Sequence, residues 1–186
     1  MRTIRTELLT LEPQVAAHAE DMFAVLSDPA IYTYENAPPA SVDWLRTRFA
    51  KLESRRSGDA SEQWLNWVIR IPGPGLIGHV QATIHSDRSA GIAYELSSRY
   101  WGRGLGAHAT RTLIEELFAK YEVERLFAVA KAANFRSLRM LERLGFGSAG
   151  AEDLAAHGVD PDEVLMSLHR PGSETAAARN RSHAGV

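Results

Sequence analysis

The sequence predicts an α+β, or mixed α/β, fold in which helices cover a sheet. In the first half of the chain, short apolar stretches are separated by turns rich in Gly, Pro and Ser, as is typical of hairpins. In the second half, short apolar stretches alternate with longer amphipathic ones, as in strand–helix units. The length of 186 residues fits one domain with room for a short extra segment.

The first expected strand covers residues 7–11, and Pro13 is a favourable first-turn residue for the helix that follows. Apolar residues then recur at helical spacing: Val15, Ala19, Met22 and Leu26. The Ser-Asp-Pro sequence at residues 27–29 ends this pattern. Ser41 is a suitable N-cap for a second helix.

A hairpin and a further strand are expected next. Alternation over residues 64–71 places four apolar side chains on one strand face: Leu65, Trp67, Ile69 and Ile71. The Pro-Gly-Pro-Gly sequence at residues 72–75 predicts a turn, and residues 76–84 are the returning strand. A second turn at residues 86–91 leads to a strand at residues 92–96.

The rest of the chain alternates helix and strand. One face of a long predicted helix is apolar: Leu105, Ala109, Leu113, Leu117 and Tyr121. Residues 126–130 form a short apolar strand, and Asn134 can cap a helix that ends at Gly145, a typical C′ glycine. Residues 164–168 are the closing strand.

Composition sets limits on fold and function. The segment 171–186 has no Leu, Ile or aromatic residue, so we expect a disordered tail after a single domain of residues 1–170. The 21 Lys and Arg against 23 Asp and Glu exclude a basic surface over the whole domain, and we expect no nucleic-acid partner. Without Cys there is no disulfide scaffold, thiolate metal site or Cys nucleophile, and scattered His residues predict no metal site. No signal-peptide or membrane-spanning stretch is evident, so we expect a cytoplasmic protein without a membrane partner.

A glycine-rich turn, Tyr-Trp-Gly-Arg-Gly-Leu-Gly-Ala-His at residues 100–108, joins a predicted strand to the longest predicted helix. Glycines permit a tight turn with accessible N–H groups, and a helix start attracts anions. Arg103 adds a cation, so a phosphate or pyrophosphate is the expected ligand, although a tight connection alone explains the glycines equally well. The Gly-x-Gly-x-Gly spacing differs from the dinucleotide fingerprint, and the chain has no P-loop.

A second motif follows, with Asn-Phe-Arg-Ser at residues 134–137 and Glu-Arg-Leu-Gly-Phe at residues 142–146. Together the two motifs resemble those of the GCN5-related N-acetyltransferase (GNAT) superfamily, above all the branch of ribosomal-protein alanine N-acetyltransferases. The resemblance covers residues 6–170 and implies a mostly antiparallel, twisted sheet of six to seven strands, splayed between the fourth and fifth, with about four helices. Trp101 departs from the family pattern, which has Gln or Arg at that position.

The resemblance implies acetyl-CoA as co-substrate. Backbone N–H groups of the glycine-rich turn would hold the pyrophosphate. The strand that ends near Leu96 would pair with the pantetheine arm, and Asn134 would hydrogen-bond the arm. The expected cofactor-binding residues are therefore Leu96, Arg103, Gly104, Leu105, Gly106, Ala107 and Asn134.

Direct acetyl transfer needs a base, because an alkylamine with a pKa of about 10.4 is mostly protonated at neutral pH. The departing thiolate also benefits from a proton donor. Many members of the family use a Tyr donor where this chain has Leu141, so the resemblance assigns the role to Ser137. Glu95, in an otherwise apolar strand, is the expected base unless it pairs with a cation such as Arg70.

Two histidines, His79 and His85, share one strand face and can relay protons, or serve as hydrogen-bonded structural residues. The resemblance places the acceptor pocket at the first two helices and the loop between them. Candidate acceptor contacts are Tyr34, Glu35, Trp44 and Asn66, with aromatic packing as the alternative.

The leading function from sequence is an N-acetyltransferase that moves an acetyl group to a primary amine by direct attack in a ternary complex. The acceptor is a small-molecule amine or a protein N-terminus, and the protein a monomer or homodimer. The main alternative is a non-catalytic CoA- or acyl-CoA-binding or sensing protein with the same fold. A nucleotide-dependent oxidoreductase is a further alternative.

Overall fold

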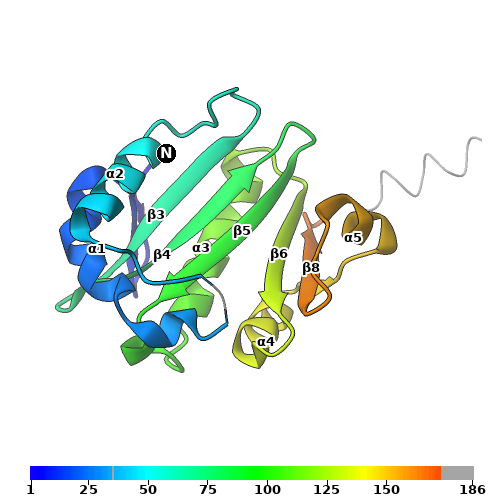
Figure 1. Ribbon diagram of the computed structural model, residues 1–186. Coiled ribbons are helices and arrows are strands. Elements are labelled where there is room, and N and C mark those ends of the chain that lie inside the picture. Colours follow the sequence, from blue (N-terminus) through cyan, green and yellow to red (C-terminus); the bar gives the residue numbers. More distant parts are fainter. Residues whose placement is uncertain (35, 173–186) are drawn as a thin grey trace, which may run out of the picture.

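The computed structural model describes residues 1–34 and 36–172. Within these residues the chain forms one sheet of eight strands in the order β1-β2-β3-β4-β5-β6-β8-β7 (Figure 1). The strands are β1 Ile4–Arg5, β2 Thr10–Pro13, β3 Gln63–Ile71, β4 Gly75–Ile84, β5 Ser89–Leu96, β6 Arg125–Lys131, β7 Gly147–Ser148 and β8 Glu163–His169. Neighbouring strands are antiparallel except β5 and β6, which are parallel.

Helices cover both faces of this sheet. The α-helices in the described residues are α1 Ala19–Leu26, α2 Val42–Leu52, α3 Leu105–Lys120, α4 Phe135–Arg143 and α5 Ala151–His157. Short 3₁₀ helices occupy Ala16–His18, Pro29–Tyr32 and Ser98–Tyr100. None of the helices in the described ranges is both long enough and apolar enough to cross a membrane.

The strand register decides which side chains face which helices. Val68 lies opposite His79, which lies opposite Glu95, so these three share the face that α1 and α2 cover. Trp67 and Val80 lie opposite each other on the other face, in the core packed against α3. Figure 1 shows α1 and α2 on one side of the sheet and α3 on the other.

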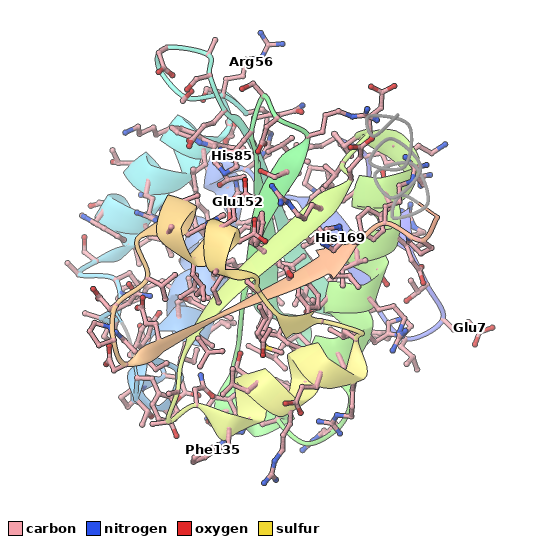
Figure 2. All side chains as sticks on the ribbon, turned by 90° about the vertical axis from the view of Figure 1, so that its right-hand side faces the viewer. Glu7, Arg56, His85, Phe135, Glu152 and His169 are labelled. Carbon is pink, nitrogen blue, oxygen red and sulfur yellow. The ribbon has the colours of Figure 1, made fainter. Side chains whose placement is uncertain are left out.

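The far end of the sheet carries α4 and α5 on opposite faces. Leu141 of α4 is fully buried in the core that α3 also contacts. His157 of α5 packs against Phe127 of β6, with 4.2 Å between the ring centroids. Figure 2 shows α5 lying across β6 and β8, with Phe135 pointing outward from the start of α4.

Several predicted elements are confirmed together with their caps. The Ser41 hydroxyl accepts a hydrogen bond from the Trp44 amide at the start of α2. The Asn134 side-chain carbonyl accepts one from the Ser137 amide at the start of α4. Gly145 follows α4 with φ of 95°, the left-handed conformation that favours glycine at C′.

The first strand and helix begin later than predicted. The segment predicted as a strand at residues 7–11 is interrupted, because the Thr6 amide donates to the Leu9 carbonyl and closes a turn, and β2 starts at Thr10. The helix predicted after Pro13 starts at Ala19, because the Val15 amide donates to Nδ1 of His18 and holds a 3₁₀ turn first.

The structure also has more elements than predicted, eight strands and five α-helices in the described residues. The additions are two-residue strands, β1 and β7, and the seven-residue α5, all too short for a periodic pattern. Residues 171–172 form a turn, and the remainder of the predicted tail, residues 173–186, lies outside the described residues.

The predicted splay between the fourth and fifth expected strands is confirmed at β5 and β6. These strands pair only over residues 89–91 and 125–127. Beyond Gly91, β5 continues along β4 to Leu96, while β6 continues along β8 to Lys131. Figure 1 shows the two strands diverging toward α4.

One ion pair ties the N-terminus to α3. Arg2 donates from Nε to Oε1 of Glu116 at 2.9 Å and from Nη2 to Oε2 at 2.6 Å. Glu116 is only 5% exposed, and the hydrogen bond from Arg2 lowers its pKa. A carboxyl group whose pKa is lower in the folded protein stabilises it above the unfolded pKa of about 4.3 and loses that contribution as the pH falls.

We therefore expect Arg2→Ala to lower the urea midpoint of unfolding at pH 7, because it leaves the Glu116 carboxylate buried without its cation. The difference in urea midpoint between variant and wild type should narrow as the pH is lowered from about 4.3 through the folded pKa of Glu116, because protonation removes the charge that Arg2 stabilises. Arg5→Ala is the control, because Arg5 is exposed. The urea midpoint of this variant should stay at the wild-type value. An equal midpoint for Arg2→Ala and Arg5→Ala at pH 7 contradicts the prediction.

Candidate active site

A cavity of about 890 Å³ opens where β5 and β6 diverge. It is lined from one side by α2 and the chain before it, and from the other by the start of α3 and by α4. Residues on both faces of β5 therefore contribute to one space. The geometry allows two molecules to meet there from opposite sides of the sheet.

The glycine-rich turn presents its backbone to this cavity. Gly102 and Gly104 adopt φ of +72° and +77°, and a Cβ at either position would meet no heavy atom within 4 Å. In the described part of the chain, no protein group accepts a hydrogen bond from the amides of residues 102–107. The turn thus offers unpaired N–H donors at the N-terminus of a 16-residue helix, an arrangement suited to an anion.

The five residues of this turn predicted to bind cofactor are placed differently. Gly104, Gly106 and Ala107 line the cavity. Arg103 and Leu105 do not; Arg103 is exposed and lies over the Tyr100 ring, 5.6 Å from its centroid.

Trp101, the departure from the family pattern, has a structural role of its own. Its indole N–H donates to the Leu96 carbonyl at 2.8 Å and so fixes the end of β5 to the turn. The Arg136 guanidinium lies over the Trp101 ring, 3.7 Å from its centroid. Trp101 therefore brings a cation of α4 to the edge of the cavity beside the glycine-rich turn.

Ser137 meets a partner that the sequence analysis missed. Its hydroxyl lies 2.6 Å from the hydroxyl of Tyr94, across the gap between α4 and β5. Burial raises the pKa of Tyr94 to about 12, against the smaller opposite effect of the Ser137 hydrogen bond, so the phenol is protonated at neutral pH. Both side chains line the cavity, and together they form a chain of two hydroxyl groups.

Glu95 lies on the opposite face of β5 and lines the same cavity. The predicted alternative, a pair with Arg70, does not form, because Arg70 donates to Glu12 at 2.7 Å. Among the described residues, the basic nitrogen nearest to Glu95 is Nδ1 of His79, 3.9 Å from its Oε2. Tyr32 lies on the same side, and its pKa is raised by burial first and by the Glu95 charge second.

The predicted acceptor contacts are only partly brought together. Tyr34 and Trp44 line the cavity and are 42% and 48% exposed. Arg48 lies over the Trp44 ring, 5.7 Å from its centroid. Asn66 is 3% exposed and lines no part of the cavity, and Glu35 lies outside the described residues.

Comparison with known proteins identifies the family. A model described as an acetyltransferase (GNAT) domain matches residues 9–147, more than half of the chain. The chain belongs to the GNAT family. The sequence resemblance is thus confirmed, and the protein is an acyltransferase by family.

Relatives of this GNAT protein align with it over most of its length. The "Uncharacterized N-acetyltransferase p20" of Bacillus licheniformis is 24% identical over 152 residues, which are 81% of this chain and 85% of the relative. Among solved structures, the ribosomal-protein-S5-alanine acetyltransferase of Vibrio fischeri has a TM-score of 0.77 and 18% identity, with 92% of this chain and 98% of that chain covered. RimL, a ribosomal L7/L12 α-N-protein acetyltransferase solved with coenzyme A, has a TM-score of 0.74 and 16% identity, with 90% and 98% covered.

Two residues of the GNAT site, Tyr94 and Arg136, were missed from sequence. Tyr94 stands two residues from Ile92, and alternation places both on the apolar face of the strand. The hydroxyl group of Tyr94 on this apolar face was the one feature of the sequence that could have indicated a functional role. No comparable pattern marks Arg136, whose contact with Trp101 depends on how α4 packs. His79 lines the cavity, whereas His85 lies beside Glu62 outside it.

Proposed function

We propose that this GNAT protein transfers the acetyl group of acetyl-CoA to a primary amine by direct attack in a ternary complex. One observation carries the proposal. A single cavity holds unpaired amides at a helix N-terminus, a pair of hydroxyl groups in the gap between β5 and β6, and a carboxylate on the opposite face of β5. These are the groups that an anionic cofactor, a leaving thiolate and an attacking amine require.

The amides around Gly104, Gly106 and Ala107 would hold the pyrophosphate, with Arg136 adding a cation beside them. Within the described residues, β5 pairs with β6 only as far as Gly91, so its later backbone groups on that side are available to the amides of a pantetheine arm. The Asn134 carbonyl caps α4, which leaves its NH₂ group to donate to the arm. Acetyl-CoA supplies the activated acetyl group in this proposal.

The reaction needs two proton movements besides the bond changes. A bond forms between the nitrogen of the neutral amine and the acetyl carbon, the carbon–sulfur bond breaks, and one amine proton passes to a base on the Glu95 side of β5. The departing thiolate takes a hydrogen bond from the Ser137 hydroxyl and then a proton relayed through it, while the Ser137 oxygen takes the Tyr94 proton and solvent in the cavity returns one to the phenol. The protonated phenol of Tyr94 donates to the Ser137 oxygen and so orients its hydrogen toward the sulfur.

The acceptor is proposed to be a protein N-terminus or a small primary amine. Two of the similar solved structures are described as acetyltransferases of ribosomal proteins, one of them of an alanine, which supports a protein N-terminus. The exposed rings of Tyr34 and Trp44 at the cavity support contacts with an extended acceptor.

Calorimetry with CoA and a free-thiol assay with acetyl-CoA test this function. The amine panel contains peptides with N-terminal Ala or Ser, spermidine and a simple alkylamine. We expect CoA binding and thiol release that depends on at least one amine. Binding without thiol release for any amine indicates a CoA-binding or sensing protein. Thermal protection by NAD(P) but not by CoA indicates an oxidoreductase.

A glycine substitution tests the cofactor site directly. Gly104→Ala is expected to weaken CoA binding about tenfold, because the added Cβ would occupy the open space through which the pyrophosphate reaches the free amides. Gly158→Ala is the matched control, with φ of +58° at the end of α5 and nothing within 4 Å of its Cβ. Both variants should lose similar thermal stability, but only Gly104→Ala should lose affinity in calorimetry. Equal CoA affinity for the two variants contradicts the placement of the pyrophosphate.

A further inference from the structure

His79 on β4 is in an unusual environment. It faces Glu95 across the β4–β5 ladder and lines the cavity with 14% of its side chain exposed. Of its two ring nitrogens, only Nδ1 is both buried and without a hydrogen-bond partner in the described structure. Nδ1 lies on the Glu95 side, so Nε2 is the nitrogen left to meet a molecule in the cavity.

A purely structural histidine does not account for this arrangement. A buried nitrogen without a partner destabilises the folded protein, and such groups in native proteins call for an explanation, of which a catalytic role is one. A carboxylate 3.9 Å away is slightly beyond hydrogen-bond distance. Catalytic hydrogen bonds are often long in the absence of substrate and shorten once it binds.

We propose that His79 accepts the proton of the acceptor amine at Nε2, while Glu95 is a positioning residue that receives a hydrogen bond from Nδ1. The inference rests on the proposed acetyl transfer and assigns its amine-side proton step. As the nitrogen–carbon bond forms, one amine proton moves to Nε2. The imidazolium that results is stabilised by the Glu95 carboxylate, and the thiolate receives its proton separately from Ser137.

The charges around His79 agree with this role. Burial lowers its pKa, Glu95 of β5 opposes that effect, and Arg48 of α2 adds to it. The imidazole is therefore neutral at pH 7, with a lone pair available to take a proton. Tyr32, near Glu95, keeps its own proton because its pKa is raised. A base that must be neutral gives activity that falls as the pH drops through its pKa, here below about 6.5.

The rate experiment uses the full chain, acetyl-CoA and the amine that releases most thiol in the panel. We expect His79→Gln and His79→Leu to lower kcat/KM about 100-fold with CoA affinity unchanged, and to abolish the acid limb of the pH profile. Added imidazole should restore part of the activity of His79→Leu. Thermal stability of His79→Leu should equal or exceed that of the wild type, because a buried unpaired nitrogen has been removed.

His85→Gln is the matched control, a histidine on the same hairpin that lies outside the cavity, and it should keep wild-type kinetics. An unchanged pH profile in His79→Gln overturns the inference, as does a rate loss in His79→Leu that follows a loss of stability. Thiol release with no amine at all, in the wild type, overturns the proposed function and this step with it.

A measurement on the free protein distinguishes failure of the inference about His79 from failure of the proposed acetyl transfer. Imidazole ¹⁵N NMR should find His79 protonated on Nδ1, with a pKa below about 6.5. Glu95→Gln should lower that pKa further, because the carboxylate opposes the effect of burial. A proton on Nε2, or a His79 pKa that does not respond to Glu95→Gln, overturns the inference even if acetyl transfer itself is observed.

Discussion

Gly78→Ala is expected to destabilise the protein by about 3 kcal/mol, the upper end for overpacking. A Cβ at Gly78 would lie 2.2 Å from the Glu95 carbonyl oxygen and 2.9 Å from the Leu96 Cα. Both are backbone atoms of the neighbouring strand, so no side chain can rotate away. The two strands must separate, and they do so at the residues that border the cavity. Urea unfolding gives the stability change, and the thiol-release assay should show a loss of activity in the molecules that remain folded.

Gly91→Ala is the control for this substitution. Gly91 is also in a central strand, opposite Thr83, but a Cβ there meets nothing within 4 Å. Alanine at an unstrained glycine site changes stability by about 1 kcal/mol or less, often upward, since it restricts the unfolded chain. If both variants unfold at the same urea concentration, the close approach of β4 and β5 at Gly78 does not cause the predicted destabilisation of Gly78→Ala.

Sequence reasoning placed the helices around the cavity well, because their ends depend on local chemistry. Ser41 and Asn134 cap helices through bonds to amides three residues on, and both interactions can be inferred from the residue type and the apolar pattern that follows. Gly145 ends α4 in a conformation that few other residues adopt. The glycine-rich turn was predictable for a similar reason, because the exposure of its amides depends on its glycines and on α3, which begins directly after it.

Contacts that depend on strand register were less accessible from sequence. The possible Glu95–Arg70 pair fails because β2 begins at Thr10, which brings Glu12 beside Arg70. The predicted strand at residues 7–11 ended before Glu12, so no sequence feature placed Glu12 beside Arg70. Asn66 was expected at the acceptor site, but its side chain is only 3% exposed and lines no part of the cavity, and the Gln14 amide donates to its backbone carbonyl.

The same limit explains why the Tyr94–Ser137 contact and the position of His79 beside Glu95 emerged only from the structure, although His79 was already a candidate proton relay from sequence. Tyr94 and His79 each lie opposite a partner that is far away in the sequence, and the distance between them is decided by packing of β5 against β4 and α4. Tyr94 and Glu95 are consecutive, so the alternation of a strand sends them to opposite faces of the sheet. In this proposal one short segment of β5 thereby serves the thiolate on one side and the amine on the other.

The second large effect is expected from Ser137→Ala, which should lower kcat about 100-fold while the Kd for CoA stays within about twofold. The hydroxyl is proposed to act on the sulfur only as the carbon–sulfur bond breaks, so its loss affects the transition state more than binding. The substitution leaves the start of α4 intact, because the capping bond to Asn134 uses the Ser137 amide and not its side chain. Single-turnover thiol release and calorimetry measure the two quantities separately.

Tyr94→Phe tests whether the two hydroxyl groups act as a unit. Removal of the phenol leaves Ser137 without the partner 2.6 Å away, so we expect a smaller loss than for Ser137→Ala, about tenfold. The double variant should be no slower than Ser137→Ala alone, because Tyr94 has no route to the sulfur except through that hydroxyl. Losses that simply multiply show that the two groups act independently. Turnover unchanged in Ser137→Ala removes the pair from the mechanism and leaves another donor to be found for the thiolate.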